Sequence, residues 1–297
     1  MTAGQGDGLD KLLLERLGPL GSSVLDLSVL GGLPVLEACL PSPFRVVFTT
    51  RLGGQSRGRF ASLNLDKRSG DEPAAVEANR ALVARAVGRR LVTPNQVHGV
   101  RVVGLAEYVA EGEETPCDGL TLHPEIDKGL AACLLFADCL PVVLCGDADL
   151  AVVHVGWRGL LEGAIQQAAR CMMSAPGSAV IGPSIGPCCF MVEEEIADAF
   201  ARRFGSQTVA DRPAAKSDGQ PEGQGWKVDL WAAAGRALEE VGVSPVRVVN
   251  PRLCTACHSD LFFSYRREGP STGRHACLAW TEDRRVITQV LPGHGKA

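Results

Sequence analysis

The chain has 297 residues, a formal net charge of −4 and 45% hydrophobic residues. This length suits one large domain or two ordinary ones, with enough apolar residues for a core. The acidic balance argues against a general nucleic-acid binder, which usually presents a basic face. No apolar run is long enough to span a bilayer.

The N-terminal segment contains acidic residues and lacks the apolar region of a signal peptide, so we expect a cytoplasmic protein that binds neither nucleic acid nor a membrane. The eleven cysteines are then expected to be reduced thiols, available for metal or catalysis. We expect residues 1–32 to form a peripheral extension and 33–297 a single catalytic domain. A mobile loop is predicted at about 206–225, which is polar, rich in Pro and Gly and without periodicity.

The first core strand is predicted over residues 45–50, directly before a segment in which glycines alternate with Arg51, Arg57 and Arg59. Glycine lets the backbone approach a ligand closely, and arginine offers forked donors to phosphate or carboxylate. The alternative is an exposed loop with solvated arginines. A scaffold helix follows over residues 71–88, with Pro73 in its first turn and Gly88 at its end.

A short strand is predicted to present Asn95, Gln96 and His98 just before Gly99. Three polar side chains that interrupt an apolar run need partners if they are buried. A lone histidine in a strand is more often a core or surface residue, but His98 is a candidate third metal ligand. The acidic residues 107–129 are predicted to form a loop.

Two buried strands are predicted at residues 134–144 and 150–155, joined by the turn CGDAD. Antiparallel pairing would bring Cys139, in the first strand, close to His154, near the end of the second. A thiol beside an imidazole suits zinc ligation or a cysteine nucleophile with a histidine base. The alternative is a buried cysteine packed beside a core histidine.

The following segments hold further candidates. A helix after Gly159 has Trp157 and Arg158 at its start, where an anion could bind. The adjacent Cys188 and Cys189 are interpreted as packing residues, because neighbouring thiols do not easily chelate one metal.

The motif C-x-x-C-H at residues 254–258 matches haem attachment or half of a zinc ribbon. We favour neither, because there is no export signal and no second C-x-x-C pair. An aromatic strand that presents Arg266, Arg267 and Arg274 could supply a stacking surface and an anion contact; the alternative is a solvated rim. The last strand is predicted over residues 285–291.

Taken together, six segments in order resemble the YfiH/YlmD family, whose members are also called laccase-domain proteins, multicopper polyphenol oxidoreductases or purine nucleoside phosphorylase-like enzymes. These segments are FTTRLGGQSRGRFASLNL (48–65), NQVHG (95–99), ADCLPVVL (137–144), HVGWRG (154–159), IGPSIGPCCF (181–190) and CTACHSDLFFSYRREGPSTGR (254–274). The resemblance implies an α/β fold: a single-domain mixed α/β sandwich related to the cysteine hydrolase domain of cytotoxic necrotising factor.

The resemblance also implies a zinc site with His98, Cys139 and His154 as ligands. Val155 replaces the alanine most common in the family, a conservative change beside the metal. The implied activity is phosphorolysis of adenosine, inosine, guanosine or methylthioadenosine, together with hydrolytic deamination of adenosine. The expected partners are therefore a purine nucleoside and phosphate.

The remaining candidates are assigned by their chemistry. Phosphate needs cationic donors, and base and ribose edges need amides. Asp138 is expected to orient a ligand or shuttle protons beside the metal. The expected catalytic residues are Cys139, His154, Asp138 and Arg51, and the expected substrate contacts are Asn64, Asn95, Gln96, Arg158 and Arg266.

Three alternatives remain open at this stage. Cys139 and His154 alone would form the dyad of a cysteine hydrolase or amidase acting on a peptidoglycan precursor. Copper in place of zinc would give a polyphenol oxidoreductase, although six histidines are few for several copper ions. A zinc-stabilised binding module is the third. The sequence leaves open the preferred purine, the native metal, the oligomeric state and the roles of residues 1–32, Cys254 and Cys257.

Overall fold

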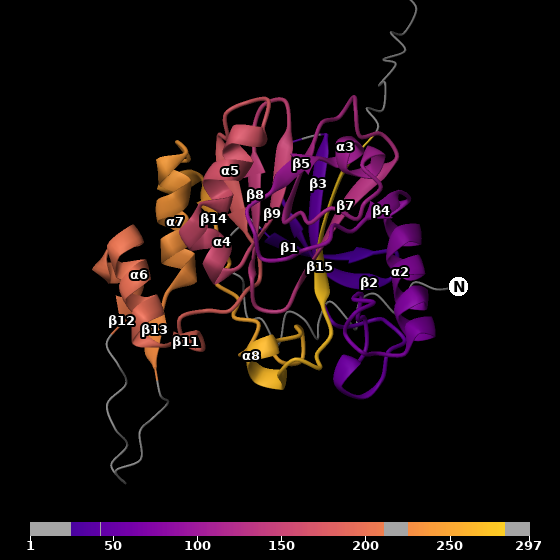
Figure 1. Cartoon of the computed structure of the whole chain (residues 1–297). Helices are drawn as coiled ribbons and strands as arrows, with labels where there is room; N and C mark the ends of the chain where they lie inside the picture. Colours follow the sequence, from indigo (N-terminus) through magenta and orange to yellow (C-terminus); the bar gives the residue numbers. More distant parts are fainter. Residues whose placement is uncertain (1–24, 42, 211–224, 283–297) are drawn as a thin grey trace, which may run out of the picture.

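Two six-stranded sheets stack face to face, and helices cover their outer faces (Figure 1). The computed structural model describes residues 25–41, 43–210 and 225–282. The layers follow the order helix, sheet, sheet, helix, so the mixed α/β sandwich expected from the resemblance is confirmed. Within the described ranges, no helix is both long and apolar enough to cross a bilayer.

Each sheet combines strands from distant parts of the chain. The first contains, in spatial order, β1 (Leu25–Leu30), β2 (Leu33–Ala38), β3 (Phe44–Thr49), β15 (His275–Thr281), β7 (Leu130–Phe136) and β4 (Arg90–Val92). The second contains β14 (Val248–Val249), β10 (Ser178–Ile181), β8 (Leu140–Cys145), β9 (Leu150–Val155), β6 (Gly119–Leu122) and β5 (Val102–Gly104). A small third sheet contains β11 (Met191–Val192), β13 (Trp226–Val228) and β12 (Val209–Ala210).

The helices lie outside the sheets, together with three short 3-10 turns. The helices are α2 (Pro73–Val87), α3 (Leu105–Ala110), α4 (Trp157–Glu162), α5 (Ala164–Cys171), α6 (Glu194–Phe204), α7 (Leu230–Glu240) and α8 (Tyr265–Glu268). The 3-10 turns are η1 (Gly58–Phe60), η2 (Ser206–Thr208) and η3 (Pro245–Arg247). Helix α2 packs on the first sheet, whereas α5 packs on the outer face of the second, and α7 and α6 follow outside it in the same hydrophobic cluster.

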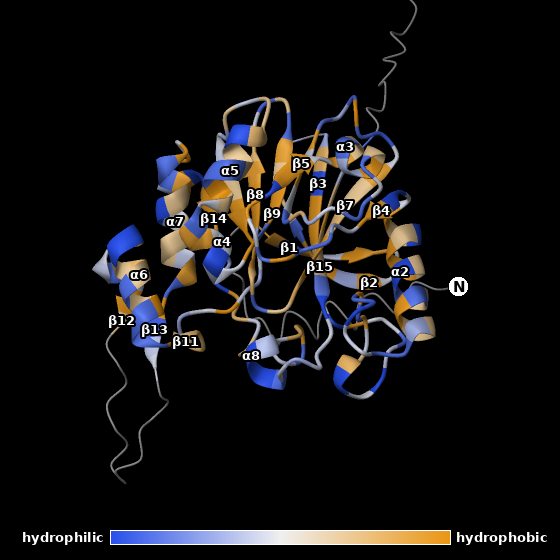
Figure 2. Cartoon of the chain, viewed as in Figure 1, coloured by the Kyte–Doolittle hydropathy of each residue, from blue (hydrophilic) through white to orange (hydrophobic). Residues whose placement is uncertain are grey.

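The central strands are apolar on both faces because each sheet is covered on both sides. In β7, Leu134 and Phe136 face the space between the sheets, and Cys133 and Leu135 face α2. Figure 2 shows the same pattern, with hydrophobic strands inside and polar surfaces on the outer helices. The alternation also decides which strand residues reach the space between the sheets, where His154 contacts Phe136.

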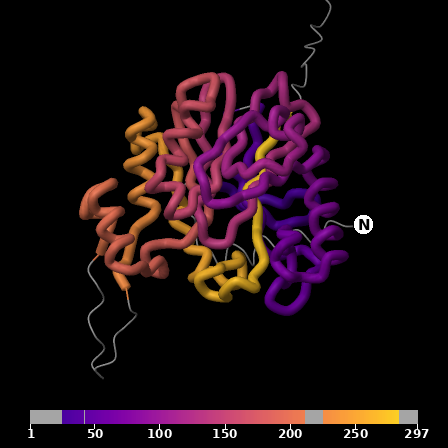
Figure 3. Tube along the Cα trace, in the orientation of Figure 1, coloured from indigo at the N-terminus to yellow at the C-terminus, as the bar shows by residue number. Residues whose placement is uncertain are grey.

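The N-terminal and C-terminal parts of the described chain meet in the first sheet. Strand β15 pairs with β3 on one side and with β7 on the other (Figure 3). The sequence analysis did not predict β15; it expected the last strand at residues 285–291, which lie outside the described residues. The helix over 71–88 and the strand over 45–50 are confirmed as α2 and β3.

The expected N-terminal extension (1–32) and the expected mobile loop (206–225) are described by the structure only in part. Residues 1–24 of the expected extension and 211–224 of the expected loop lie outside the described residues. Residues 25–30 form β1, which pairs with β2 and buries Leu25 and Leu30. The limit at residue 32 therefore falls inside a β-hairpin, and the described end of the extension belongs to the sheet.

Four predictions of local structure were wrong. The strand expected through Cys139 is divided into β7 and β8, which belong to different sheets. Residues 95–98 form a loop between β4 and β5, and the expected loop at 107–129 contains most of α3 and all of β6. Residues 265–268 form α8 rather than a strand, because the Ser264 side chain accepts a hydrogen bond from the Arg267 amide and caps a helical turn.

Candidate active site

The site begins where the chain passes from the first sheet to the second. Between β7 and β8, Asp138 has a φ of 100°, a conformation that is rare for a residue with a side chain. Its carboxylate accepts hydrogen bonds from Thr255 Oγ1 and from the Arg266 amide, both at 2.6 Å. These two contacts hold the connection between β7 and β8, here called the Cys139 corner. They place the next residue, Cys139, directly before β8.

Strand β9 brings His154 to this corner. The hairpin of β8 and β9 pairs Leu140 with Val155 and Pro141 with His154, as the sequence analysis expected. Gly156 follows, and a Cβ there would lie 3.0 Å from His98 Cδ2 and 3.4 Å from Cys139 Sγ. Glycine is therefore needed at this position, because any side chain would crowd the cluster.

Asp118, at the entry to β6, holds both histidines. Its Oδ1 lies 2.8 Å from His154 Nδ1, which leaves Nε2 as the ring nitrogen available to a ligand. The same carboxylate accepts hydrogen bonds from the backbone amides of Val97, His98 and Gly99 at 3.2, 2.9 and 2.8 Å. These bonds stabilise the positive φ of 62° at His98 and fix the loop that carries it.

The electrostatics of these groups are coupled. Although burial opposes it, contact with His154 and the loop amides holds the pKa of the Asp118 carboxyl below its ordinary value. Burial also opposes ionisation of Cys139, but His154 and His98 lower the pKa of its thiol to about 6. Cys139 and Asp118 in turn raise the pKa of His154 to about 9, against the effect of burial.

His98, Cys139 and His154 form one cluster, which is the prediction that depended most on the resemblance. Their ligand atoms all lie within 4.8 Å of one another, and the two imidazole rings are 4.8 Å apart between centroids. Two imidazoles and a thiolate are donors that zinc prefers, and a buried carboxylate behind a histidine is the usual support of such a ligand. The residues therefore fit a metal ion.

A pocket of about 480 Å³ opens beside the cluster, a volume in the range of small-molecule sites. Its walls combine the cluster, several arginines and three aromatic side chains. The lining residues are Asp66, Arg68, Gln96, His98, Leu135, Ala137, Asp138, Cys139, His154, Trp157, Arg158, Ile185, Phe190, Tyr265, Arg266 and Arg274.

The arginines of the pocket are held by neighbours and keep donors available. The Arg158 guanidinium lies 4.7 Å from the Trp157 ring centroid, and among the described residues none accepts a hydrogen bond from it. Arg266 lies 5.2 Å from the Phe190 ring centroid and donates to the Cys189 carbonyl. Such stacked guanidiniums are preorganised for an anion.

The other two arginines of the pocket were not assigned to substrate by the sequence analysis. Arg68 donates to Asn95 Oδ1 at 2.9 Å, and Arg274 donates to the carbonyls of Thr272 and Gly273. Arg274 was considered as an anion contact on an aromatic strand, and Arg68 was not considered at all.

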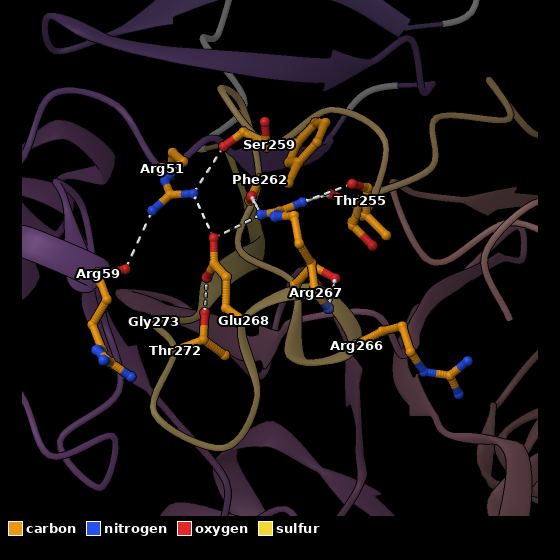
Figure 4. A network of polar contacts seen from close by, with 12 residues as sticks. Arg51, Arg59, Thr255, Ser259, Phe262, Arg266, Arg267, Glu268, Thr272 and Gly273 are labelled. Atoms are coloured by element: carbon orange, nitrogen blue, oxygen red, sulfur yellow. Dashed lines mark hydrogen bonds and ion pairs between the residues drawn. The ribbon is translucent and has the colours of Figure 1, made fainter. Parts of the chain in front are cut away.

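Arg51 does not reach this pocket. Its guanidinium donates to the carbonyls of Ala61, Arg59 and Ser259 and to Glu268 (Figure 4). It also lies 4.4 Å from the Phe263 ring centroid. The phosphate contact expected of Arg51 is therefore not favoured, because its donors are already bound within the protein.

The predicted amide contacts are divided between the pocket and its support. Gln96 lines the pocket but exchanges two hydrogen bonds of 2.8 Å with the Leu135 backbone. Asn95 holds Arg68 from outside the pocket. Asn64 is fully buried and accepts a hydrogen bond from the Arg274 amide at 2.9 Å. These amides position pocket residues.

Asp118 is the principal residue that sequence reasoning missed. It lies in the acidic segment that was interpreted as a loop, directly before the apolar residues 119–122. A carboxylate directly before a short strand needs hydrogen-bond partners if it is buried, and this signal could have identified Asp118.

Comparison with known proteins places this site in a family. The family model described as multi-copper polyphenol oxidoreductase laccase matches residues 45–282. The protein named purine nucleoside phosphorylase YfiH from Shigella flexneri is 33% identical over 247 residues, which cover 81% of this chain and 95% of that protein. A purine nucleoside phosphorylase from Xylella fastidiosa is 35% identical over 261 residues, covering 83% and 96%.

Crystal structures agree with these sequences. The Neisseria meningitidis protein NMB0706 matches with a TM-score of 0.73 at 34% identity, covering 84% of this chain and 99% of that one. YlmD from Geobacillus stearothermophilus matches with a TM-score of 0.70 at 27% identity, covering 88% and 100%. Because the family model and the relatives extend over most of its length, the chain belongs to the YfiH/YlmD family, whose model is described as multi-copper polyphenol oxidoreductase laccase.

Proposed function

We propose that the protein is a zinc-dependent purine nucleoside phosphorylase that also deaminates adenosine. One observation carries the proposal: a cluster of His98, Cys139 and His154 shares a pocket with the guanidiniums of four arginines. The names of the curated relatives support the same reaction class. Phosphorolysis requires both an anion site and a site for the purine, and the two kinds of lining residue meet these needs.

The phosphate would bind to the arginine wall. Arg158, whose donors are not used by the described residues, is the first contact, and Arg266 is the second. In phosphorolysis a phosphate oxygen forms a bond to the ribose C1′ while the bond from C1′ to the purine nitrogen breaks. Guanidiniums fixed before the substrate arrives hold the anion in position for this attack without reorganisation.

The purine would lie against the aromatic side of the pocket, where Trp157, Phe190 and Tyr265 offer ring faces for stacking. Asp138 is held in this arrangement by Thr255 and the Arg266 amide, one on each of its oxygens. Its role is to position Cys139 and the Arg266 backbone.

His98, Cys139 and His154 would hold the zinc ion, with Asp118 fixing the orientation of the two histidines. When bound, zinc supplies Lewis-acid chemistry and makes hydroxide available near neutral pH, which hydrolytic deamination at the purine C6 requires.

Product chromatography tests the proposal. Zinc-loaded protein is incubated with adenosine and with inosine, each with and without phosphate, beside the variants Cys139→Ala and Cys39→Ser. We expect free base only with phosphate, inosine from adenosine, and neither product from Cys139→Ala. Cys39 is exposed and its thiol donates to Asp26, so its serine variant is a control that should keep full activity. Absence of turnover by zinc-loaded wild type would exclude the proposal.

A second candidate, a cysteine hydrolase or amidase, is favoured by one observation. Cys139, His154 and Asp118 stand in the order nucleophile, base and orienting carboxylate, and the thiol has a lowered pKa. His98 distinguishes the two candidates, because a triad does not need it. Hydrolysis of an amide that survives His98→Ala but not Cys139→Ser would favour the hydrolase.

Copper-dependent polyphenol oxidation finds less support. Several copper ions need several histidine-rich sites, and in the described residues one cluster alone contains histidine. The other cluster consists of cysteines.

A further inference from the structure

Four cysteines converge beside the pocket, outside the cluster already described. The sulfur atoms of Cys188, Cys189, Cys254 and Cys257, here called the four-cysteine cluster, all lie within 4.8 Å of one another. Cys257 Sγ is 3.5 Å from both Cys188 Sγ and Cys189 Sγ. The sequence analysis interpreted the adjacent pair as packing residues and found no partner for the C-x-x-C motif. The structure places the two pairs opposite each other.

Backbone hydrogen bonds build this arrangement from two separate segments. The turn 186–190 closes when the Cys189 and Phe190 amides donate to the Gly186 carbonyl. The turn 254–258 closes in the same way, through the Cys257 and His258 amides and the Cys254 carbonyl. The Gly186 amide donates to Cys254 Sγ at 3.3 Å and joins the two turns. The thiols therefore converge because the backbone directs them, without depending on chance side-chain packing.

The spacing suits a tetrahedral thiolate site. With metal–sulfur bonds of about 2.3 Å, the sulfurs of a Cys₄ zinc site lie about 3.8 Å apart. Four sulfur ligands in a tetrahedron indicate zinc or an iron–sulfur centre, and the four sulfurs lie at separations compatible with a single zinc ion. Cys188 and Cys257 are exposed, so an ion can enter without unfolding of the chain. We propose that the four-cysteine cluster binds a second zinc ion, distinct from the one at His98, Cys139 and His154.

The second zinc ion would have a structural role. A site filled by four protein ligands has no open position for substrate. The Cys189 carbonyl accepts a hydrogen bond of 3.0 Å from Arg266, and Phe190 lies under the same guanidinium. In the other turn, Thr255 donates to Asp138. An ion that joins the two turns would fasten Arg266 and the Cys139 corner at once.

Alkylation of the native wild-type protein gives the first test and needs no variant. Cys39, Cys188 and Cys257 are all exposed thiols in this structure. We expect iodoacetamide to modify Cys39 alone in zinc-loaded protein, and to modify Cys188 and Cys257 after a chelator is added, as read by peptide mass spectrometry. Rapid modification of Cys188 and Cys257 before the chelator, or protection relieved by a reductant alone, would overturn the proposal. The latter result would indicate a disulfide.

Metal content gives the second test. Protein purified under reducing, anaerobic conditions is measured as wild type, Cys188→Ser/Cys257→Ser, His98→Ala/Cys139→Ala and the control Cys39→Ser. We expect two zinc ions per chain in wild type and control, and one in each double variant. X-ray absorption of the His98→Ala/Cys139→Ala variant should show sulfur neighbours alone, at about 2.3 Å. A wild type with one zinc ion that Cys188→Ser/Cys257→Ser retains would overturn the proposal, as would a sulfur shell around another metal.

Kinetics test the structural role. If the proposed phosphorolysis is correct, Cys188→Ser/Cys257→Ser should raise the KM for phosphate several-fold, while kcat changes little. This readout depends on the proposed function, whereas metal content and alkylation do not. A protein without nucleoside turnover that binds two zinc ions would therefore refute the activity and leave the second site standing.

Discussion

Asp118 and Glu268 are both carboxylates that collect several hydrogen-bond donors, but Asp118 is buried, Glu268 is half-buried, and their donors differ in kind. Asp118 receives three backbone amides and His154, and its side chain is 1% exposed. Glu268 receives the guanidiniums of Arg51 and Arg267 and the Thr272 hydroxyl (Figure 4). The first carboxylate supports the cluster of His98, Cys139 and His154, whereas the second neutralises arginines that support one wall of the pocket.

The comparison shows that a carboxylate can either orient a functional side chain or hold loops together. A carboxylate that accepts from one histidine ring and from the loop amides of another histidine orients the first ring and fixes the backbone that carries the second. A carboxylate between two arginines binds loops together, because each arginine also donates to backbone carbonyls. Arg51 reaches the carbonyls of residues 59, 61 and 259, and Arg267 reaches those of 255, 256 and 262. We therefore expect loss of Asp118 to affect catalysis and loss of Glu268 to affect stability.

Asp118→Asn is expected to have the largest effect. The amide presents an N–H toward some of the donors that the carboxylate accepted, so the orientation of the His154 ring and the position of the loop that carries His98 are lost. Loss of such a supporting partner typically lowers metal affinity or activity on the order of 10- to 100-fold. Zinc titration and kcat/KM for inosine phosphorolysis measure the change.

Asp127→Asn is the matched control for Asp118→Asn. Asp127 is also buried and also accepts from backbone amides, those of Ala106 and His123, but it does not line the pocket. It should reduce stability without reducing metal affinity. Equal loss of metal affinity in both variants would show that Asp118 has no special role.

Glu268→Gln is expected to lower the free energy of unfolding by about 2 kcal/mol, because a half-buried, charge-assisted acceptor is removed from two guanidiniums. Urea denaturation measures this. Glu239→Gln, which removes a more exposed partner of Arg236 on α7, should change stability by less than about 0.5 kcal/mol. If the two variants were equally stable, the Glu268 network would contribute no more to the free energy of unfolding than a surface ion pair does.

The same comparison shows what the sequence could and could not predict. The hairpin that brings Cys139 to His154 follows from apolar runs and a turn, and the resemblance added His98. The sequence could not separate Arg51 from Arg158, because both arginines lie within two residues of a glycine and their difference lies in distant partners. Glu268 comes 217 residues after Arg51, and no local pattern reports such a contact.

The missed strands have a related cause. Strand β6 is a run of four residues inside an acidic segment, and β15 is identified by its pairing with β3 and β7 rather than by an alternating pattern. An apolar run also does not indicate which sheet its residues join. Residues 134–144 were therefore interpreted as one strand, although they contribute to two sheets. Local periodicity identifies buried segments, while the corner at Asp138 depends on Thr255 and Arg266, more than 100 residues away.

Arg158→Ala tests whether the pocket arginines differ from those bound by Glu268. Since Arg158 makes no hydrogen bond to the described residues, its removal should leave stability unchanged and raise the KM for phosphate about tenfold, equivalent to about 1.4 kcal/mol. Arg202→Ala, which removes an exposed charge on α6, is the control for net charge. A similar rise in KM from Arg202→Ala would point to long-range electrostatics instead of a contact.

The pH dependence of stability gives the smallest and most specific difference. Burial opposes ionisation of Glu268, but Thr272, Arg267 and Arg51 hold the pKa of this carboxyl below its ordinary value. Its contribution is therefore present in full above the unfolded pKa of about 4.3 and is lost as the pH falls through the lower folded pKa. Burial instead raises the pKa of the Asp127 carboxyl, despite its amide donors. Its contribution is present below the unfolded pKa of about 3.9 and is lost as the pH rises through the folded pKa.

Urea denaturation between about pH 3 and 7 measures both effects. As the pH falls, the stability difference from wild type should shrink for Glu268→Gln and grow for Asp127→Asn. Parallel curves for the two variants would contradict the distinction between a carboxylate held by guanidiniums and one held by amides alone.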